Sequence, residues 1–541
     1  MSLIPGLAHA ADPAPAPGKA HGVALPDQDL SEVRPTKTFT SPAEAGTKSA
    51  APAAGTSKAA GAPKAQTAAD PTYRVGLTAV HTSAHGIELA AKLTAAADQS
   101  LQVTIDWGDN SWQESYGATG TGLERRQHAY SEVGTYLITV KAEDTAAGTS
   151  VTNTVSVTTM GSEFTPHTPT RLLDTRDGTG APKGKVGPNG SARLKVAGVG
   201  KIPAGATTAV LNVTVTNATA AGHITAFASG AARPTTSNLN FEPGQTVPNL
   251  VVVPIGTDGY VDLYNSGLGT VDLIADVTGY FTQSAASGYT AITPERFVDT
   301  RIGLGTRKGQ VEGFKGFGTA ISGVRSVPAG ATAVALNVTV TNPKDDGHLT
   351  VYPGGTKAPT ASNLNFRGGQ TVANSVIVPI GADGKISIRN GGWKGTDVIV
   401  DVVGFYSPNS QAAYVPFQPF RWLDTREWKW GPLPGRHYIP MRLSTKYPGT
   451  KAFIMNTTVT NTKGVGFLAV APDPNSKEAY EGNYDSPPSA PGSSTLNFTP
   501  GKTVPNLVQA STGYHGIIDV FNESDANIDV VVDIFGDYEV D

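Results

Sequence analysis

The 541-residue sequence contains no cysteine, which excludes disulfide bonds and thiolate metal sites. Without disulfides, its domains need roughly 100 residues or more to form cores large enough for stability. No apolar run reaches the roughly 20 residues that a bilayer-spanning helix requires. Charged residues make up only 16% of the chain and the net charge is −4, so there is no basic field for nucleic acid or an anionic membrane.

Glycine and proline are plentiful, with 62 and 39 residues, as expected of short strands joined by many turns. No segment shows a sustained helical period. Alternation is present instead: Ala209, Leu211 and Val213 fall on one face of an extended segment, and Asn212 and Thr214 on the other. We expect the polar face to be solvated or bonded across strands, with ligand presentation as the alternative.

One motif, Arg-x-x-Asp-Thr-Arg, occurs three times, beginning at Arg171, Arg296 and Arg421, so each copy starts 125 residues after the previous one. The same landmarks follow in each copy, including Asn-x-Thr-Val-Thr-Asn, Leu-Asn-Phe and a closing Asp-x-x-Gly. A repeat of this length is a domain and not a solenoid unit. The sequence predicts an all-β protein whose repeats are homologous β-sandwich domains of about eight or nine strands, with Greek-key and jelly-roll orders both open. Their predicted bounds are 164–283, 289–408 and 414–541.

The N-terminal part has three predicted regions. Ala8-His9-Ala10 has the form of a signal-peptide cleavage site, so we expect residues 1–10 to be the remnant of a signal peptide and the protein to be secreted. Residues 11–70 are rich in Ala, Pro, Gly, Ser and Thr and predict a disordered linker. A β pattern beginning at Tyr73 predicts a small sandwich over 72–160.

This small sandwich resembles the PKD family of immunoglobulin-like domains. The resemblance rests on Asp106–Ser111 (Asp-Trp-Gly-Asp-Asn-Ser), His128–Tyr130 and Val133–Val140. PKD modules are typically extracellular spacers or binding modules, so the resemblance implies adhesion or presentation. We expect Asp106 and Asp109 to shape a turn, because two carboxylates fall short of the six to eight oxygen ligands that Ca²⁺ usually takes.

The repeats, in turn, resemble modules with an Arg-Leu-Leu-Asp-Thr-Arg opening and a Gly-Tyr-Phe close that recur in secreted proteins of actinobacteria. Such modules sit beside wall hydrolases, peptidases or other binding domains. The resemblance implies a secreted module and indicates no activity.

The repeated motif also predicts a structural network that joins the first and last strands of each copy by Arg–Asp pairs. An extended chain would put Asp174 and Arg176 on one face and Arg171 on the other. We expect the arginines and carboxylates of the network to be largely buried and mutually bonded, and Asp299→Ala should then cost roughly 3–5 kcal/mol. The alternative is an arginine fork that holds an acidic sugar or a carboxylate. The predicted network residues are Arg171, Asp174, Arg176, Asp276, Arg296, Asp299, Arg301, Asp401, Arg421, Asp424, Arg426 and Asp533.

Copy three differs from the other two by aromatic residues and by an insertion around Ser476–Ser493. Aromatic clusters beside polar loops stack sugar rings or form binding hot spots in many proteins. The predicted binding residues are therefore Trp428, Trp430, Tyr438, Tyr480 and Tyr484. The alternative is that they are core aromatics or contacts between domains.

Enzyme motifs such as His-Glu-x-x-His, Gly-x-Ser-x-Gly or a phosphate loop do not occur. We therefore expect a secreted, non-enzymatic surface or adhesion protein without cofactor or metal. Its partner would be an extracellular glycan, a cell-wall polymer or a protein, bound multivalently. A structural subunit of an extracellular assembly is the competing class, and an enzyme of unfamiliar type is a third.

Overall fold

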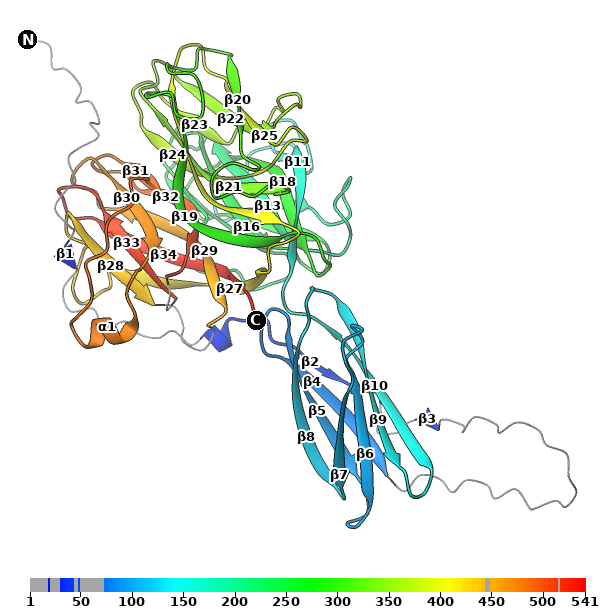
Figure 1. The fold of residues 1–541 in the computed structure, drawn as a ribbon. Coiled ribbons are helices and arrows are strands. Elements are labelled where there is room, and N and C mark those ends of the chain that lie inside the picture. Colours follow the sequence, from blue (N-terminus) through cyan, green and yellow to red (C-terminus); the bar gives the residue numbers. More distant parts are fainter. Residues whose placement is uncertain (1–17, 20–29, 43–46, 49–72, 443–447, 514–515) are drawn as a thin grey trace, which may run out of the picture. The chain divides into compact units, whose positions relative to one another are not determined.

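The computed structural model describes residues 18–19, 30–42, 47–48, 73–442, 448–513 and 516–541 (Figure 1). The chain forms two compact units. One consists mainly of described residues between 35 and 162, and the other contains residues 30–34 with the three repeats. The predicted signal-peptide remnant and much of the predicted linker lie outside the described residues. No described helix is long and apolar enough to cross a membrane.

The prediction of a disordered linker over 11–70 is wrong for residues 30–42. Leu30–Glu32 form a 3₁₀ turn whose Leu30 is fully buried. Strand β2 (Thr38–Thr40) pairs antiparallel with β4 (Arg74–His81). The segment is poor in apolar residues, and the surface that orders it is supplied by the folded domains.

The smaller unit is a sandwich of two antiparallel sheets, ordered β2-β4-β5-β8 and β3-β10-β9-β6-β7 (Figure 1). Trp107 is buried in its core, and Tyr130 packs beside it. The remaining strands are β3 (Thr47–Lys48), β5 (Gly86–Thr94), β6 (Ser100–Asp106), β7 (Glu114–Thr119), β8 (Gly122–Ala129), β9 (Thr135–Asp144) and β10 (Thr149–Thr158).

Each repeat is an eight-stranded jelly roll, which settles the alternative that the sequence left open. Module 1 has the sheet orders β11-β18-β13-β16 and β12-β17-β14-β15, which are strands 1-8-3-6 and 2-7-4-5 of the repeat. Its strands are β11 (Glu163–Asp174), β12 (Ser191–Lys195), β13 (Ala206–Thr216), β14 (Gly222–Ala228), β15 (Leu239–Phe241), β16 (Val247–Pro254), β17 (Tyr260–Asn265) and β18 (Asp272–Thr282).

Modules 2 and 3 repeat this order, as predicted for homologous domains. The strands of module 2 are β19 (Gly288–Asp299), β20 (Gly316–Ala320), β21 (Ala333–Thr341), β22 (Gly347–Pro353), β23 (Leu364–Phe366), β24 (Val372–Pro379), β25 (Lys385–Asn390) and β26 (Asp397–Ser407). Those of module 3 are β27 (Ala413–Asp424), β28 (His437–Arg442), β29 (Thr450–Thr460), β30 (Gly466–Pro472), β31 (Leu496–Phe498), β32 (Val504–Ser511), β33 (Ile517–Asn522) and β34 (Asp529–Glu539).

Module 3 carries two additions. The insertion contains a short helix, α1 (Lys477–Glu481), capped at its N-terminus by the side chain of Ser476. Strand β1 (Gly18–Lys19) pairs in parallel with β28 at the edge of the second sheet.

The modules share a core in addition to their own. Each module buries apolar residues between its two sheets, and a further cluster draws residues from the first sheet of all three. Its aromatic rings contact one another in a cycle. The ring-centroid distances are 4.2 Å for Phe164–Tyr406, 4.1 Å for Tyr289–Tyr538 and 4.8 Å for Phe281–Tyr414.

These three contacts join module 1 to 2, 2 to 3, and 3 back to 1. The same two positions of the repeat are used each time, so the three interfaces are equivalent and head-to-tail. We call this assembly of the three modules the ring. The first sheets face the shared core, and the second sheets, which contribute nothing to it, form the other layer of each module.

Candidate functional site

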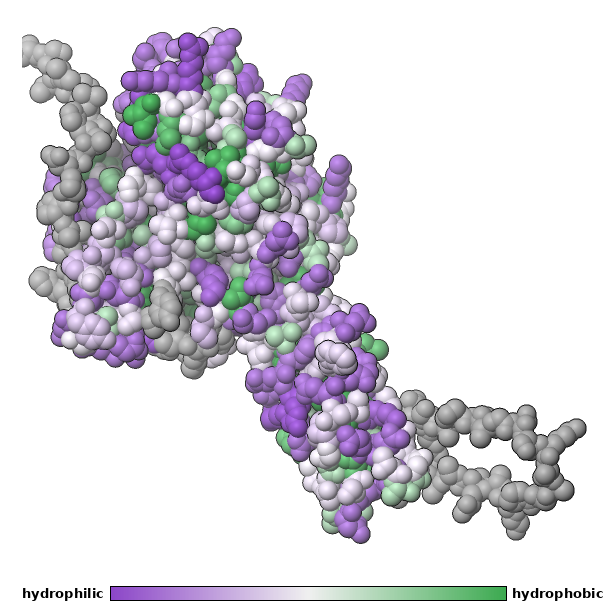
Figure 2. Space-filling model, viewed as in Figure 1, coloured by the Kyte–Doolittle hydropathy of each residue, from purple (hydrophilic) through white to green (hydrophobic). Residues whose placement is uncertain are grey.

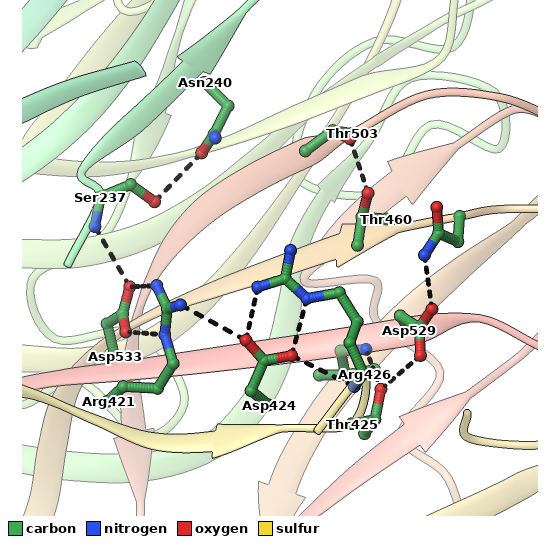
Figure 3. A network of polar contacts seen from close by, with 12 residues as sticks. Ser237, Asn240, Arg421, Asp424, Thr425, Arg426, Thr460, Thr503, Asp529 and Asp533 are labelled. Carbon is green, nitrogen blue, oxygen red and sulfur yellow. Dashed lines mark hydrogen bonds and ion pairs between the residues drawn. The ribbon is translucent and has the colours of Figure 1, made fainter. Parts of the chain in front are cut away.

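The Arg-x-x-Asp-Thr-Arg motif forms the predicted Arg–Asp network in every module, drawn for module 3 in Figure 3. Arg421 donates from Nε to Asp533 Oδ1 at 2.9 Å and from Nη2 to Asp533 Oδ2 at 3.3 Å. Arg426 donates from Nε to Asp424 Oδ1 at 2.7 Å. The first strand of the module is thereby tied to the last, because Arg421 lies on β27 and Asp533 on β34.

Two details of the predicted network are wrong. Its carboxylates are buried, but its arginines reach solvent, and 45% of the Arg176 side chain is exposed. Arg171 and Asp174 were expected on opposite faces, yet Arg171 Nη1 lies 3.1 Å from Asp174 Oδ2. A register shift between Arg171 and Leu173 interrupts the alternation of the strand and brings the two side chains together.

Burial and charge act in opposite directions on the network's carboxyls. Burial raises the pKa of Asp533, and the hydrogen bonds and charge of Arg421 only partly offset it. The Asp424 pKa is lowered, chiefly by its hydrogen bonds from Arg426. The residue after it, Thr425, donates to Asp529, which also accepts from Asn461. The charged and polar groups of the motif thus find their hydrogen-bond and ion-pair partners within the protein.

The network also reaches across the junctions between modules. The backbone N–H of Ser237, in module 1, donates to Asp533 of module 3 at 3.2 Å (Figure 3). Arg296 of module 2 donates to the carbonyl of Gly492 in module 3 at 2.9 Å. These contacts place the network of modules 2 and 3 at boundaries between modules.

Asparagine side chains complete the junctions, and sequence reasoning missed their role. Asn249 donates to Asn456 at 3.1 Å, joining modules 1 and 3, and Asn506 donates to Asn337 at 3.1 Å, joining modules 3 and 2. Asn212 donates to the carbonyl of Ser362 at 2.6 Å, joining modules 1 and 2. The available signal was the retention of these asparagines in all three copies.

The five aromatic residues predicted to bind a partner do not form one cluster. Trp428 and Trp430 contact each other edge to face at 4.8 Å, and Lys429 lies over the Trp430 ring. Tyr438 is fully buried on β28 and is not available to a ligand, which corrects its assignment. Tyr480 lies on α1, and Tyr484 is exposed beyond it.

The insertion explains the burial of Tyr438. The outward face of the second sheet of module 3 carries Tyr438 and Phe521, and Ala490 of the insertion packs against them. Within the insertion, Tyr480 donates its hydroxyl to buried Asp473. Burial first, and Asp473 second, raise the pKa of the neighbouring Asp519 to about 10. Tyr438 and Tyr480 therefore belong to a closed polar core.

A small pocket lies at the junction of modules 2 and 3, where Asn337, Asp401 and Ser494 line it. Asp401 is already paired with Arg296 through Nε at 2.9 Å. In the part of the chain that the structure describes, no three His, Asp or Glu side chains are grouped as metal ligands. The pocket is a small recess between modules with both polar and apolar lining residues.

In the smaller unit, the carboxylates of the Asp-Trp-Gly-Asp turn are used locally. Asp106 accepts from the N–H of Gly108 at 2.9 Å, and Asp109 accepts from the N–H of Ser111 at 3.0 Å. Asp109 also lies 2.7 Å from His128, whose ring stacks on Trp107. These bonds shape the turn in the way the sequence suggested.

No protein-family model matches the chain, and no curated protein matches it in sequence. Among solved structures it is similar to a SusE-like protein at 10% identity and TM-score 0.12, covering 38% of this chain and 96% of that one. A tandem pair of CBM22 domains from Paenibacillus barcinonensis is 11% identical with TM-score 0.15, covering 44% and 98%. The Sulfolobus turreted icosahedral virus structure is 9% identical with TM-score 0.15, covering 70% and 90%. Likenesses this distant carry no argument about function.

Proposed function

We propose that the chain is a secreted, non-enzymatic surface protein that binds an extracellular glycan or protein partner through outward surfaces of the ring. The observation that carries this proposal is the cyclic closure of the three modules around a shared core. Closure fixes the modules relative to one another and turns their second sheets and connecting loops outward, although the insertion covers part of that surface on module 3. A rigid carrier with several outward surfaces is suited to multivalent binding.

The use of the retained polar residues supports binding over catalysis. The Arg, Asp and Asn side chains that recur in all three modules are bonded to one another within and between modules. Activated groups of an active site would instead converge on a place where a substrate fits. In this protein the repeated residues build the carrier, so function lies in the positions where the copies differ.

The exposed apolar residues support binding over a role as a purely structural subunit. An assembly of equivalent blocks would use apolar patches at equivalent places on each copy. On the face drawn in Figure 2, apolar residues of the ring are scattered among polar ones. The large exposed ones also differ between equivalent positions: Leu268 in module 1 corresponds to Trp393 in module 2 and Asp525 in module 3.

The proposal is tested by binding of the full-length chain to a glycan array and by pull-down with isolated cell-wall polymers. We expect micromolar or tighter apparent affinity for an immobilised polymer and weaker affinity for its short oligomers, because immobilisation permits several contacts at once. The double variant Trp428→Ala/Trp430→Ala tests the predicted aromatic site in the intact ring and should lose tenfold or more if that pair is a main contact. The proposal would be overturned if the chain bound no glycan and no polymer and captured no protein partner.

A further inference from the structure

The most exposed aromatic pair of the ring lies on module 2 and was not singled out by its sequence. Phe314 and Trp393 come from two loops at one end of the second sheet, before β20 and after β25. Their rings meet edge to face with centroids 4.8 Å apart. Trp393 is 78% exposed and Phe314 44% exposed. Burial in a core therefore does not account for either ring.

Phe314 also holds a backbone conformation that suits it poorly. Its φ is +59°, in the left-handed region, which costs a bulky side chain more than it costs asparagine. The equivalent residues, Asn189 in module 1 and Arg436 in module 3, have φ of +55° and +58°. The fold demands this conformation in every copy, and module 1 meets it with the favoured residue. Module 2 keeps a phenylalanine there without burying it, and backbone strain of this kind concentrates at ligand sites.

The jelly-roll fold does not require particular residues at the positions of Phe314 and Trp393. In module 3 the same two positions hold Arg436 and Asp525, joined by an ion pair at 3.0 Å. In module 1 they hold Asn189 and Leu268. Three chemically different pairs occupy one scaffold, so the aromatic pair of module 2 is not a requirement of the jelly roll.

The two loops that carry the pair are held firmly. Asn390 donates to the carbonyl of Val311 at 2.9 Å and to that of Lys394 at 2.8 Å, so one side chain ties both loops together. Phe314 N–H bonds the carbonyl of Gly392 at 3.2 Å. A Cβ on Gly313 would lie 2.1 Å from the Trp393 carbonyl oxygen, so only glycine permits the approach. The rings are thus preorganised for a ligand, which lowers the entropy cost of binding.

The size and charge of the patch identify its occupant. Two aromatic side chains offer roughly 150–250 Å² each, which is less than the roughly 800 Å² per partner of a stable protein interface. Charges of both signs lie around the pair, with Lys394 near Asp345 at 3.6 Å and Glu312 and Lys315 flanking the loop. These four charges balance, so they favour neither an anion nor a cation as the ligand.

We propose that Phe314 and Trp393 form a stacking site for uncharged pyranose rings of a polysaccharide. This inference rests on the proposed function and assigns it a site. The apolar face of a sugar ring packs on the indole, as aromatic side chains present a rigid, partly apolar surface at low entropy cost. The site lies on module 2, whereas the predicted tryptophan pair lies on module 3.

The test is affinity gel electrophoresis of the full-length chain in gels that contain one neutral polysaccharide each: a β-glucan, a xylan, a mannan or a galactan. The wild type should be retarded by at least one, and Trp393→Ala should lose tenfold or more of that affinity. Leu268→Ala is the matched control at the equivalent position of module 1 and should bind as the wild type does. A polyuronate gel serves as the charged comparison and should retard the wild type less.

A second variant separates binding from stability. Phe314→Asn places the residue of module 1 in the left-handed conformation, so it should melt at the same or a higher temperature while binding at least several-fold more weakly. A lower melting temperature with unchanged affinity would overturn the inference and make Phe314 structural. If the wild type binds a neutral polysaccharide and Trp393→Ala binds it equally, the site is wrong while the proposed function stands. If the wild type binds only the polyuronate or a protein, the site is again wrong, and if it binds nothing, both fall.

Discussion

Asp299 and Asp519 are both buried carboxyls, but their surroundings differ. Burial disfavours ionisation of Asp299, yet the hydrogen bonds and charge of Arg301 outweigh it and its pKa is lowered. Burial and the neighbouring Asp473 both act to raise the pKa of Asp519. Both carboxyl oxygens of Asp519 are fully buried. The surroundings of Asp299 therefore favour its ionised form, and those of Asp519 favour its neutral form.

Replacing Asp299 by alanine should cost about 1–3 kcal/mol of unfolding free energy, the range for losing a charged hydrogen-bond partner. This is less than the 3–5 kcal/mol expected from sequence, because Arg296 and Arg301 are partly exposed and water can solvate them after the change. Chemical denaturation measures the effect, and Asp424→Ala in module 3 should give a similar value. A change below about 0.5 kcal/mol in both would mean that the network contributes geometry and not stability.

Replacing Asp519 by asparagine should stabilise the protein at neutral pH. A pKa raised on folding means that stability is present below the unfolded value, near 4, and falls as pH rises toward 10. Asparagine does not ionise, so its advantage over the wild type should grow by at most about 1.4 kcal/mol per pH unit in that window. Thermal melts of both proteins between pH 5 and 8 measure this. If the variant is less stable at every pH, Asp519 is ionised and paired in the folded state.

At the scale of elements, β13 shows what alternation can and cannot predict. Leu211 and Val213 face the core of module 1 as predicted. Asn212 and Thr214, on the other face, are buried too, because that face is covered where the modules meet. A strand with polar residues at every second position has the same sequence pattern whether that face meets water or a polar junction. The sequence therefore did not reveal that a neighbouring module covers this face of β13. Thr216 and Thr246 do bond across strands at 2.8 Å, one of the predicted uses of this face.

The ordered structure of the insertion and of the N-terminal segment could not be predicted from sequence for a different reason. Both lack periodicity, and each is ordered by a surface that other elements provide. Residues 30–34 pack on module 3, where Val33 accepts a hydrogen bond from the N–H of Gln418 at 3.0 Å. Arg34 pairs with Asp537 of β34 at 3.2 Å and with Glu539. Module 3 alone has acids at these two positions of the closing strand, so the segment has one docking place.

Arg34→Ala should therefore destabilise the ring by roughly 3–5 kcal/mol, the range for breaking a buried ion pair. The side chains of Arg34 and Asp537 are both almost fully buried, and burial already raises the pKa of Asp537. Urea denaturation measures the loss, with Arg193→Ala as control, because its pair with Asp258 is exposed and should contribute under about 1 kcal/mol. Equal effects of the two variants would mean that the segment docks without contributing to stability.

At the scale of the whole molecule, the ring explains why the sequence revealed the modules but not their arrangement. Phe281, Tyr406 and Tyr538 stand at one position of the repeat, and each contacts the preceding module in the cyclic order. A residue needed for the core of each domain is repeated in all three copies. A residue needed for each junction is repeated in the same way. Only the three-dimensional structure separates the two, since contact between copies has no sequence period.

A shared core predicts that the three modules unfold together. Tyr538 packs on Tyr289 of module 2, and its ring also lies 5.5 Å from Tyr414. Tyr538→Ala should cost about 3–5 kcal/mol, as for other large-to-small changes in a core. Hydrogen exchange followed by mass spectrometry should then show peptides of all three modules losing protection to the same extent. The sandwich of residues 35–162 has its own core and should keep its protection.

The contrary result is loss of exchange protection in module 3 alone. If Tyr538→Ala speeds exchange only in residues 414–541, while the first two modules keep their wild-type protection, each jelly roll is stable on its own and the junctions are late, weak contacts. Loss of protection in all three modules would instead mean that the aromatic residues of the shared core and the asparagine pairs at the junctions belong to one cooperative unit. In that case the spacing of the outward surfaces is fixed, and a polymer gains affinity only when its own repeat fits the distance between sites on neighbouring modules. Rigidity of the ring would thus set both its stability and its selectivity for long ligands.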